Sequence, residues 1–325
     1  MVSFWAVLVP LILIHAYREY WARRQLSQIH HAKFSGELMQ AGNTYIARRP
    51  ASNGSTHSIV CFPGFLEDMR YFQDLYKDNN AELIFVNNAN YHCPFTVEGV
   101  SNDIINVDWP TNPYQLGSIE HDGFYLGLVL DKLATGDNIT VHGHSRGGAV
   151  VLETGRQYPT LTHSKDRPVR AILEAAVLPQ ARTTGNGSEP IPHRINCYFM
   201  PILFGLLRNI SEQRLRKMPM MRPSNELKNH LCRSIFSVAR SYDTCVKNVR
   251  SIVAWQRNTK FDVYNNYPSL TVVLGQRDSV LDNKSMLASA EQGQALNSGL
   301  SIIKTEQTNH FISLEQPQII RALTD

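Results

Sequence analysis

The sequence predicts an α/β fold, in which helices pack on the faces of a mostly parallel sheet. Short runs of β-branched and other apolar residues alternate along the chain with segments of helical spacing. Some runs are apolar almost throughout, as at 58–62, which is typical of a strand buried on both faces of a parallel sheet. In the stretch 138–150 a β-branched run turns through glycines straight into an apolar helical segment. These three observations together favour the α/β class.

Composition and charge exclude several classes of protein. A chain of 325 residues that is 43% hydrophobic and 18% charged can bury a substantial core, in one large domain with an insertion or in two domains. The net charge of +4 is mild, and the basic residues are not interleaved with aromatic ones, which argues against a nucleic-acid partner. The five cysteines lack a metal-ligand spacing, so we expect buried or free thiols. An odd number of cysteines fits a reducing compartment better than a secreted protein.

Residues 1–24 are predicted to form a hydrophobic N-terminal membrane anchor, in the form of a transmembrane helix. The run from Phe4 to Ile14 is almost wholly apolar, and aromatic residues and arginines follow it, as at a membrane interface. The arginines would keep the following domain on the cytoplasmic side. A signal peptide that is cleaved before secretion is one alternative, although no Lys or Arg precedes Phe4. A hydrophobic helix packed on the domain is the other, because the run is shorter than the roughly 20 residues that span a bilayer.

The first part of the predicted core, residues 25–180, alternates strands and helices as a parallel sheet requires. The expected elements are edge strands within 32–38 and 43–47, strands at 58–62 and 81–86 with a helix through Arg70 between them, a loop over 87–111, a helix over 113–133, and strands before Gly143 and at 171–176.

The segment Gly143-His144-Ser145-Arg146-Gly147 has the Gly-x-Ser-x-Gly pattern of a nucleophile elbow. Glycines flank the serine because the turn brings strand and helix backbones too close for larger side chains. The hydroxyl of Ser145 is then exposed at the carboxyl end of the strand. A serine in a glycine-rich turn without chemistry is the alternative interpretation.

A helical cap is predicted at residues 181–261, before the second part of the core at 262–325. Apolar residues at spacings of three and four indicate helices with one apolar face, and most of them are expected to pack in the core; they are Leu227, Leu231, Ile235, Val238, Tyr242, Cys245, Val249 and Ile252. Residues 198–207 are apolar all round, a composition suited to lining a substrate tunnel. Strands at 269–275 and 299–304 complete the core.

Positive charge is concentrated in the predicted cap. Between His193 and Arg257 the sequence has twelve Lys or Arg and three Asp or Glu, although the whole chain carries only +4. A basic segment with an apolar face suits an anionic membrane surface or an acidic carrier. A solvated helix face that binds nothing is the alternative.

Two further residues fit a serine nucleophile. A serine hydroxyl is a weak nucleophile at neutral pH, so Ser145 needs a histidine base, and that histidine needs a carboxylate to orient it. Asp278 follows the strand at 269–275, and His310 follows the last strand. The carboxyl ends of parallel strands form one edge of an open sheet, so these three side chains are expected to converge there.

These motifs resemble those of the α/β-hydrolases of the esterase and lipase type. The resemblance covers about 58–317 and rests on Pro63-Gly64-Phe65, on the Gly-x-Ser-x-Gly segment, on Gly275-Gln276-Arg277-Asp278, and on Asn309-His310-Phe311 followed by Leu314-Glu315-Gln316-Pro317. It implies an α/β-hydrolase fold with a helical cap and a catalytic triad of Ser145, Asp278 and His310, with no cofactor and no metal. It also implies an oxyanion hole made by the main-chain N–H groups of Phe65 and Arg146. Pro63 departs from the histidine that many members have there, which leaves the subfamily open.

Glu174 is an alternative acid, because it ends a predicted strand where some members of the family carry theirs. Asp278 is preferred, since it follows a strand and the Gly275 turn in the chain order typical of the family. The other histidines, among them His142 and His144, are expected to be structural or exposed, and none of them forms a zinc site.

The sequence therefore predicts a membrane-associated serine hydrolase that cleaves the carboxylic ester of a small acyl or lipid-like substrate through an acyl-enzyme. A thioesterase that acts on an acyl carrier is the nearest alternative, because fold and triad leave the leaving group open. A catalytically silent binding protein on the same fold is the third hypothesis, and it belongs to a different functional class.

Overall fold

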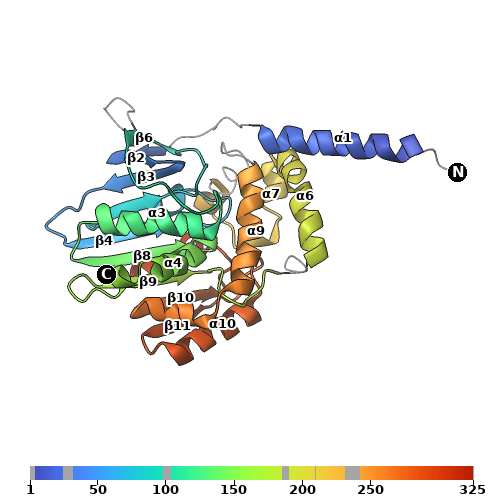
Figure 1. Ribbon diagram of the computed structural model, residues 1–325. Helices are drawn as coiled ribbons and strands as arrows, with labels where there is room; N and C mark the ends of the chain where they lie inside the picture. The colour runs from blue at the N-terminus through green and yellow to red at the C-terminus, as the bar shows by residue number, and fades with distance from the viewer. Residues whose placement is uncertain are drawn as a thin grey trace.

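The structure is a computed structural model of the chain that describes residues 4–24, 32–97, 104–184, 190–208, 210–230 and 242–324. Within these residues nine strands form one sheet in the order β11-β10-β9-β8-β4-β5-β3-β2-β7, and β1 pairs with β6 in a separate ladder (Figure 1). The strands are β1 (Ala32–Phe34), β2 (Glu37–Ala41), β3 (Thr44–Arg49), β4 (His57–Phe62), β5 (Glu82–Val86), β6 (Phe95–Val97), β7 (Ile105–Asn106), β8 (Asn138–His144), β9 (Val169–Glu174), β10 (Ser269–Gly275) and β11 (Leu300–Thr305).

The helices flank this sheet and form the segment between β9 and β10. They are α1 (Phe4–Arg23), α2 (Arg70–Tyr76), α3 (Ile119–Lys132), α4 (Arg146–Gln157), α5 (Pro159–Thr162), α6 (Pro190–Leu207), α7 (Glu212–Leu215), α9 (Tyr242–Asn258), α10 (Asn283–Leu296), α11 (Ile312–Glu315) and α12 (Pro317–Arg321), with 3₁₀ turns η1 (Pro219–Met221) and η2 (Phe261–Asn266).

The centre of the sheet is parallel, as predicted. From β11 through β10, β9, β8 and β4 to β5 every neighbouring pair runs parallel, whereas β3 is antiparallel to both β5 and β2. The carboxyl ends of these six parallel strands therefore share one edge.

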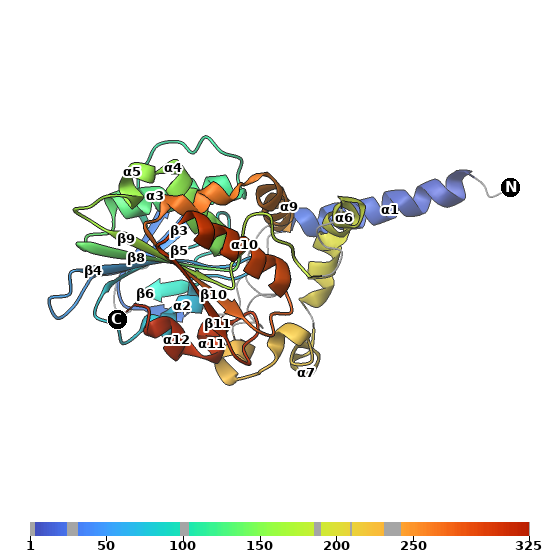
Figure 2. The same ribbon diagram turned by 90° about the horizontal axis from the view of Figure 1, so that it is seen from below.

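The central strands form because both of their faces are buried. In β4, Val60 and Phe62 pack with the side of the core that carries α3 and α4, while Ile59 and Cys61 pack with the side that carries α2, α11 and α12. Alternate residues of a strand point to opposite faces, so a fully apolar run needs a helical layer on each. Figure 2 shows these two layers above and below the sheet.

Two boundaries differ from the prediction. The helix expected over 113–133 begins at Ile119, because the Ser118 side chain accepts a hydrogen bond from the His121 amide and caps the first turn. The loop expected over 87–111 contains the short strands β6 and β7, which pair with β1 and β2. Strands this short have no periodicity that a sequence reveals, so their pairing partners determine them.

Helices α6, α7 and α9 lie in the segment predicted as a cap, and α6 packs against α9 at one end of the molecule (Figure 1). The apolar positions Leu231, Ile235 and Val238, and also Cys232, lie outside the described residues. The four other cysteines, at positions 61, 93, 197 and 245, are buried, in agreement with the expectation of buried thiols.

Helix α1 projects from the body of the molecule, and only its C-terminal part packs on the cap (Figures 1 and 2). The ring of Trp21 lies against Gly205 of α6, where a Cβ atom would come within 2.3 Å of it. His15 and Arg18 both contact Tyr198 of the same helix. The alternative of a helix packed on the domain therefore describes this part of α1.

The prediction of a transmembrane helix was wrong. None of the helices in the described part of the chain is both long and apolar enough to cross a membrane. Pro10 and His15 interrupt the apolar run, and Arg18 and Glu19 lie inside the helix. Toward the N-terminus the apolar side chains are exposed, with Phe4 at 72%.

Candidate active site

Ser145 lies in a strained turn between β8 and α4. Its backbone has φ +51° and ψ −117°, a combination that residues with a side chain rarely adopt. A Cβ atom on Gly143 would lie 2.5 Å from the Gly147 carbonyl oxygen, and one on Gly147 would lie 2.1 Å from the Phe62 carbonyl oxygen. The tight contact between strand and helix thus requires glycine at both positions.

The three residues predicted to converge lie within hydrogen-bonding distance of one another. His310 Nε2 is 2.9 Å from Ser145 Oγ, and His310 Nδ1 is 2.8 Å from Asp278 Oδ2. Ser145 follows β8, Asp278 follows β10 and His310 follows β11, so each stands beyond the carboxyl end of a parallel strand. All three are largely buried, Ser145 being 7% exposed and His310 3%.

Asp278 is oriented by its own loop. Its Oδ1 accepts hydrogen bonds from the amides of Val280 at 2.8 Å and Leu281 at 3.0 Å, which leaves Oδ2 facing His310. Burial alone would raise the pKa of Asp278, but His310 and the two amides outweigh it and lower that pKa. The ionised carboxylate accepts from Nδ1–H, so the lone pair of Nε2 faces the Ser145 hydroxyl.

Glu174, the alternative acid, is engaged elsewhere. Its Oε2 lies 2.9 Å from His142 Nε2, and its Oε1 accepts hydrogen bonds from the Tyr71 hydroxyl at 2.7 Å and the Ser313 amide at 2.5 Å. Burial opposes its ionisation, but the His142 hydrogen bond dominates the opposing contributions and the pKa falls to about 2. Glu174 is thus the ionised centre of a separate buried network, and Asp278 is the carboxylate beside His310.

The two predicted oxyanion donors flank the serine. Arg146 is the first residue of α4, and Phe65 belongs to the turn after β4. That turn lies against the nucleophile, because a Cβ atom on Gly64 would come within 2.8 Å of Ser145 Cβ. In the hydrogen bonding of the described residues, neither the Phe65 amide nor the Arg146 amide has an acceptor. Both N–H groups are therefore available to an oxyanion.

Comparison with known proteins identifies the fold. No known family profile matches the sequence, and no curated protein matches it. MenH from S. aureus superimposes with a TM-score of 0.60 at 15% identity, over 86% of this chain and 95% of that one. An esterase from Exiguobacterium antarcticum gives 0.58 at 17% identity, over 89% and 99% of the two chains. A thermophilic esterase from Thermogutta terrifontis gives 0.57 at 16%, over 92% and 96%.

This chain has the α/β-hydrolase fold. At identities this low, structural similarity shows the fold alone. The matches confirm the fold class that the sequence predicts. The elbow, Asp278 and His310 stand at one edge of the sheet, where an open parallel sheet binds its ligands.

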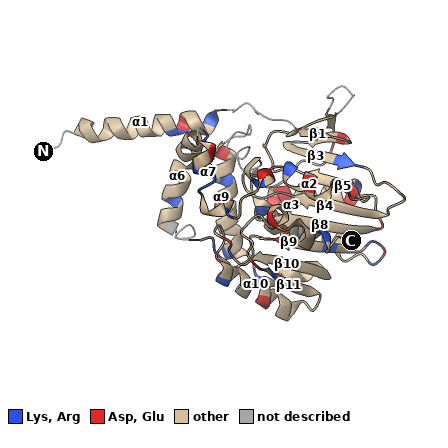
Figure 3. Ribbon diagram, turned by 180° about the vertical axis from the view of Figure 1, so that it is seen from behind, with Lys and Arg blue, Asp and Glu red and all other residues tan. Residues whose placement is uncertain are grey.

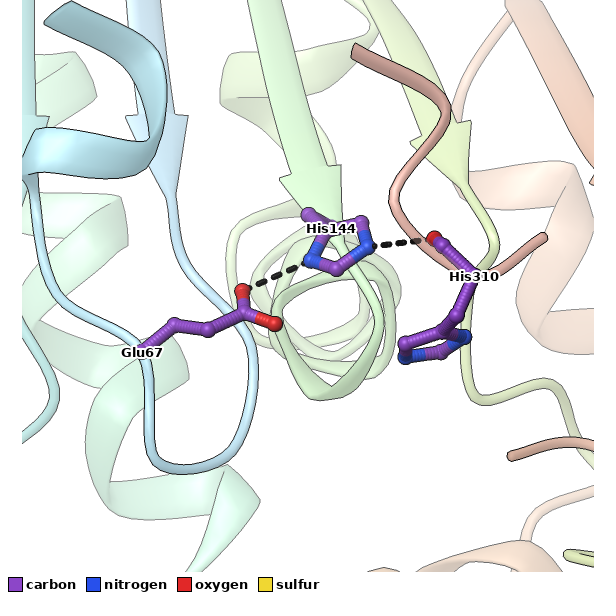
Figure 4. Close-up of side chains that lie close together, drawn as sticks. All are labelled: Glu67, His144 and His310. Atoms are coloured by element: carbon purple, nitrogen blue, oxygen red, sulfur yellow. Dashed lines mark hydrogen bonds and ion pairs between the residues drawn. The ribbon is translucent and has the colours of Figure 1, made fainter. Parts of the chain in front are cut away.

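A histidine that was predicted to be structural or exposed connects to the triad. His144 is fully buried, its Nδ1 is 2.7 Å from Glu67 Oε2, and its Nε2 is 2.9 Å from the carbonyl oxygen of His310 (Figure 4). Ligand-capable atoms of these three residues lie within 4.8 Å of one another. Both ring nitrogens of His310 already face Ser145 and Asp278, so the cluster is a hydrogen-bond network.

Apolar side chains of α6 and α9 pack against the turn that carries Phe65. Tyr91, Phe204, Tyr242 and Cys245 form a buried cluster, against which Phe65 also packs. The ring centroids of Phe65 and Phe204 are 6.2 Å apart. The cap helix α6 therefore contacts the turn that carries a predicted oxyanion donor.

Sequence reasoning missed two buried polar residues beside the elbow, Glu67 and Asn88. Asn88 follows β5 in the run Asn87-Asn88, and polar residues directly after a fully buried strand are a usable signal for the functional edge of a parallel sheet. Glu67 had no such signal, because it lies in a turn of mixed composition.

Proposed function

We propose that this protein is a serine hydrolase that cleaves a carboxylic ester through an acyl-enzyme on Ser145. The observation that carries the proposal is the continuous hydrogen-bonded chain from Asp278 through His310 to the Ser145 hydroxyl, with distances of 2.8 and 2.9 Å. That chain is the arrangement that activates a serine.

The reaction proceeds in two halves. Ser145 Oγ attacks the ester carbonyl carbon while His310 Nε2 takes its proton, and Asp278 stabilises the resulting imidazolium. The tetrahedral oxyanion accepts hydrogen bonds from the Phe65 and Arg146 amides. The C–O bond to the alcohol breaks, His310 returns the proton to the leaving oxygen, and water then attacks the acyl-enzyme by the same route to release the acid.

An acyl substrate is supported by the surroundings of the serine. The turn beside Ser145 packs through Phe65 against the apolar cluster of Tyr91, Phe204 and Tyr242, and apolar surroundings suit an acyl chain better than a polar group. Esterases are among the solved structures of the same fold, which agrees with ester chemistry. A thioester would enter the same steps with a thiol as leaving group, so thioesters belong in the test.

The test compares wild type with Ser145→Ala on p-nitrophenyl esters of increasing chain length and on acyl thioesters. We expect hydrolysis and covalent labelling by a fluorophosphonate probe in wild type, and a loss of at least about 10⁴-fold in kcat for Ser145→Ala. Ser269→Ala, at an exposed position at the start of β10, is the control.

The outcomes separate the hypotheses. A folded wild type that hydrolyses none of the substrates and leaves Ser145 unlabelled is a binding protein on this fold, and the hydrolase proposal is then wrong. Faster turnover of thioesters than of matched oxygen esters assigns the protein to the thioesterases instead.

A further inference from the structure

The turn that carries Phe65 is closed by its own hydrogen bonds. The Glu67 amide donates to the Gly64 carbonyl oxygen at 3.3 Å, and the Gly64 amide donates to Glu67 Oε2 at 2.8 Å. Leu66, at the tip, has φ +65°. Outside this pair of hydrogen bonds, the Leu66 amide donates to the Tyr91 hydroxyl at 3.3 Å, whereas Gly64 and Glu67 are the residues of the turn that connect to the neighbours of Ser145.

The residue before the nucleophile holds Glu67. His144 Nδ1 is 2.7 Å from the same Oε2 that accepts from Gly64. His144 Nε2 carries a hydrogen, because its partner, the His310 carbonyl oxygen, can only accept. Figure 4 shows the imidazole between the two. Burial would lower the pKa of His144, but the Glu67 carboxylate raises it to about 9, so the contact to Glu67 is an ion pair at neutral pH.

The residue after the nucleophile holds Gly64 through an intermediary. Arg146 Nη1 donates to Asn88 Oδ1 at 2.7 Å, and Asn88 Nδ2 donates to the carbonyl oxygens of Gly64 at 2.9 Å and Glu67 at 3.2 Å. Arginine can only donate, so the amide orientation of Asn88 is determined. Arg146 and Asn88 are both fully buried, and Asp122 Oδ2 accepts from Arg146 at 2.6 Å.

The hydrogen bond to the Gly64 carbonyl oxygen also determines the direction of the Phe65 N–H group. The peptide bond between Gly64 and Phe65 is planar and trans, so its C=O and N–H point in opposite directions. With the carbonyl oxygen directed at Asn88, the Phe65 N–H points to the other side of that peptide. Rotation of the peptide would break the Asn88 contact and the turn hydrogen bond from Glu67 together.

We propose that His144 and Arg146, the two neighbours of Ser145, clamp the turn 64–67 from both ends through Glu67 and Asn88, and so position the Phe65 amide as an oxyanion donor. The inference rests on the proposed hydrolase function. Glu67, Asn88 and His144 are positioning residues, and Arg146 has two roles, since its main chain supplies one donor and its side chain orients the other. Nucleophile and oxyanion donors then move as one unit, as preorganised catalysis requires.

The experiment uses full-length variants with little change of side-chain shape. Each variant removes one arm of the clamp, either the contact of Glu67 with His144 or the hydrogen bonds of Asn88 to the turn. Asn88→Asp keeps an acceptor for Arg146 but cannot donate to the Gly64 carbonyl when ionised, and Glu67→Gln removes the charge that pairs with His144. Asn88→Leu and Glu67→Ala remove each arm completely. Measurements are kcat and KM per active site, counted by the p-nitrophenol burst, and the Ki of a trifluoromethyl ketone, whose serine adduct carries an oxyanion.

Matched controls lie at the opposite edge of the sheet. Asn297 Nδ2 also donates to two carbonyl oxygens, those of Tyr264 and Tyr267, each at 2.8 Å. Glu82 is a buried carboxylate paired with Arg48 at 2.7 Å. Asn297→Asp and Glu82→Gln repeat the chemistry of the two conservative variants without touching the turn.

We expect each conservative clamp variant to lower kcat about 10- to 100-fold, to change KM less than about threefold, and to raise the ketone Ki by the same factor as it lowers kcat/KM. The alanine and leucine variants should lose more, and the controls should keep wild-type kcat and Ki even where Tm falls. Such a match between kinetics and ketone affinity reports transition-state stabilisation rather than folding.

The clamp is overturned if Asn88→Asp and Glu67→Gln keep wild-type kcat and ketone Ki per active site and lose only thermal stability. It is equally overturned if the controls lose kcat and ketone affinity to the same extent. If one variant fails to fold, the other conservative variant decides, because each reports a separate arm.

An inactive, unlabelled wild type contradicts the hydrolase proposal itself, whereas an active wild type with unaffected variants contradicts the clamp alone.

Discussion

At the scale of single residues, two carboxylates stand near the ends of the neighbouring strands β9 and β10 and have different surroundings. Asp278 faces His310 Nδ1, whereas Glu174 is enclosed by His142, Tyr71 and Ser313. We expect Asp278→Asn to lower kcat by about 10² to 10⁴, because the amide no longer holds the tautomer that leaves Nε2 free for Ser145.

Glu174→Gln is the matched comparison. It should leave kcat per active site within about threefold of wild type and lower the free energy of unfolding by about 2 to 5 kcal/mol, since it weakens a buried network. Burst titration gives the kcat of both variants, and urea unfolding gives their stability. A larger loss of kcat in Glu174→Gln than in Asp278→Asn would return the acid role to Glu174.

The His144–Glu67 ion pair predicts a pH dependence of stability. The pKa of His144 is raised in the folded state to about 9, above its unfolded value of about 6.5, so protonation stabilises the fold. This contribution is complete below about pH 6.5 and is lost as the pH rises to 9 and beyond, with a slope of at most about 1.4 kcal/mol per pH unit.

The measurement is the difference in unfolding free energy between wild type and His144→Gln from pH 6 to 10. The glutamine variant lacks this titration, so the difference should shrink between pH 6.5 and 9. A difference that is constant over this range would show that His144 is not charged in the folded state.

At the scale of elements, helix α6 connects the cap to the site. Phe204 is 7% exposed and its ring lies 6.2 Å from that of Phe65 and 5.5 Å from that of Tyr242, whereas Phe199 on the same helix is 44% exposed. If the proposed acyl chain contacts this cluster, Phe204→Ala removes part of its apolar surface.

We expect Phe204→Ala to lower kcat/KM for a p-nitrophenyl octanoate about 10-fold or more relative to the acetate, since each lost apolar contact is worth about 1 to 3 kcal/mol. Phe199→Ala, the control on the same helix, should leave the octanoate-to-acetate ratio unchanged. An equal loss on both esters in Phe204→Ala would mean that this cluster supports the cap without contacting the chain.

Some of the basic side chains in the segment predicted as a cap form ion pairs within the protein. The sequence places an excess of basic residues there, and Figure 3 shows Lys and Arg on α6, α7 and α9. Several of them pair within the protein, as in Lys228–Glu315 at 2.5 Å, Arg216–Glu212 at 2.5 Å and Lys247–Asp243 at 2.8 Å. Part of the excess is therefore neutralised locally. Lys228 is buried with its partner, whereas Arg216 and Lys247 are at least partly exposed, which supports the interpretation as a solvated face for these two residues.

At the scale of the whole molecule, the site exists because four parallel strands lie side by side. The order β8-β9-β10-β11 brings Ser145, Asp278 and His310 to one edge although up to 165 residues separate them in the chain. Local patterns predicted these strands well, because strands buried on both faces are apolar runs and the elbow needs its glycines.

Other parts of the molecule had no local signal. The strands β6 and β7 are too short for periodicity, and Glu67 belongs to a turn without a motif. The apolar run in 1–24 had the composition of an anchor, yet Trp21, which follows it, packs on Gly205 of α6. In each case the deciding partner comes from a different part of the chain.

The sequence by itself determined the alternation of strands and helices, the strained serine turn, and the three residues that follow strand ends, because backbone sterics and burial act locally. Only the tertiary structure placed Asp278, and not Glu174, beside His310 and brought Glu67 and Asn88 to the elbow. A hydrogen bond depends on a few tenths of an ångström between side chains from separate strands, and no pattern along the chain encodes that distance.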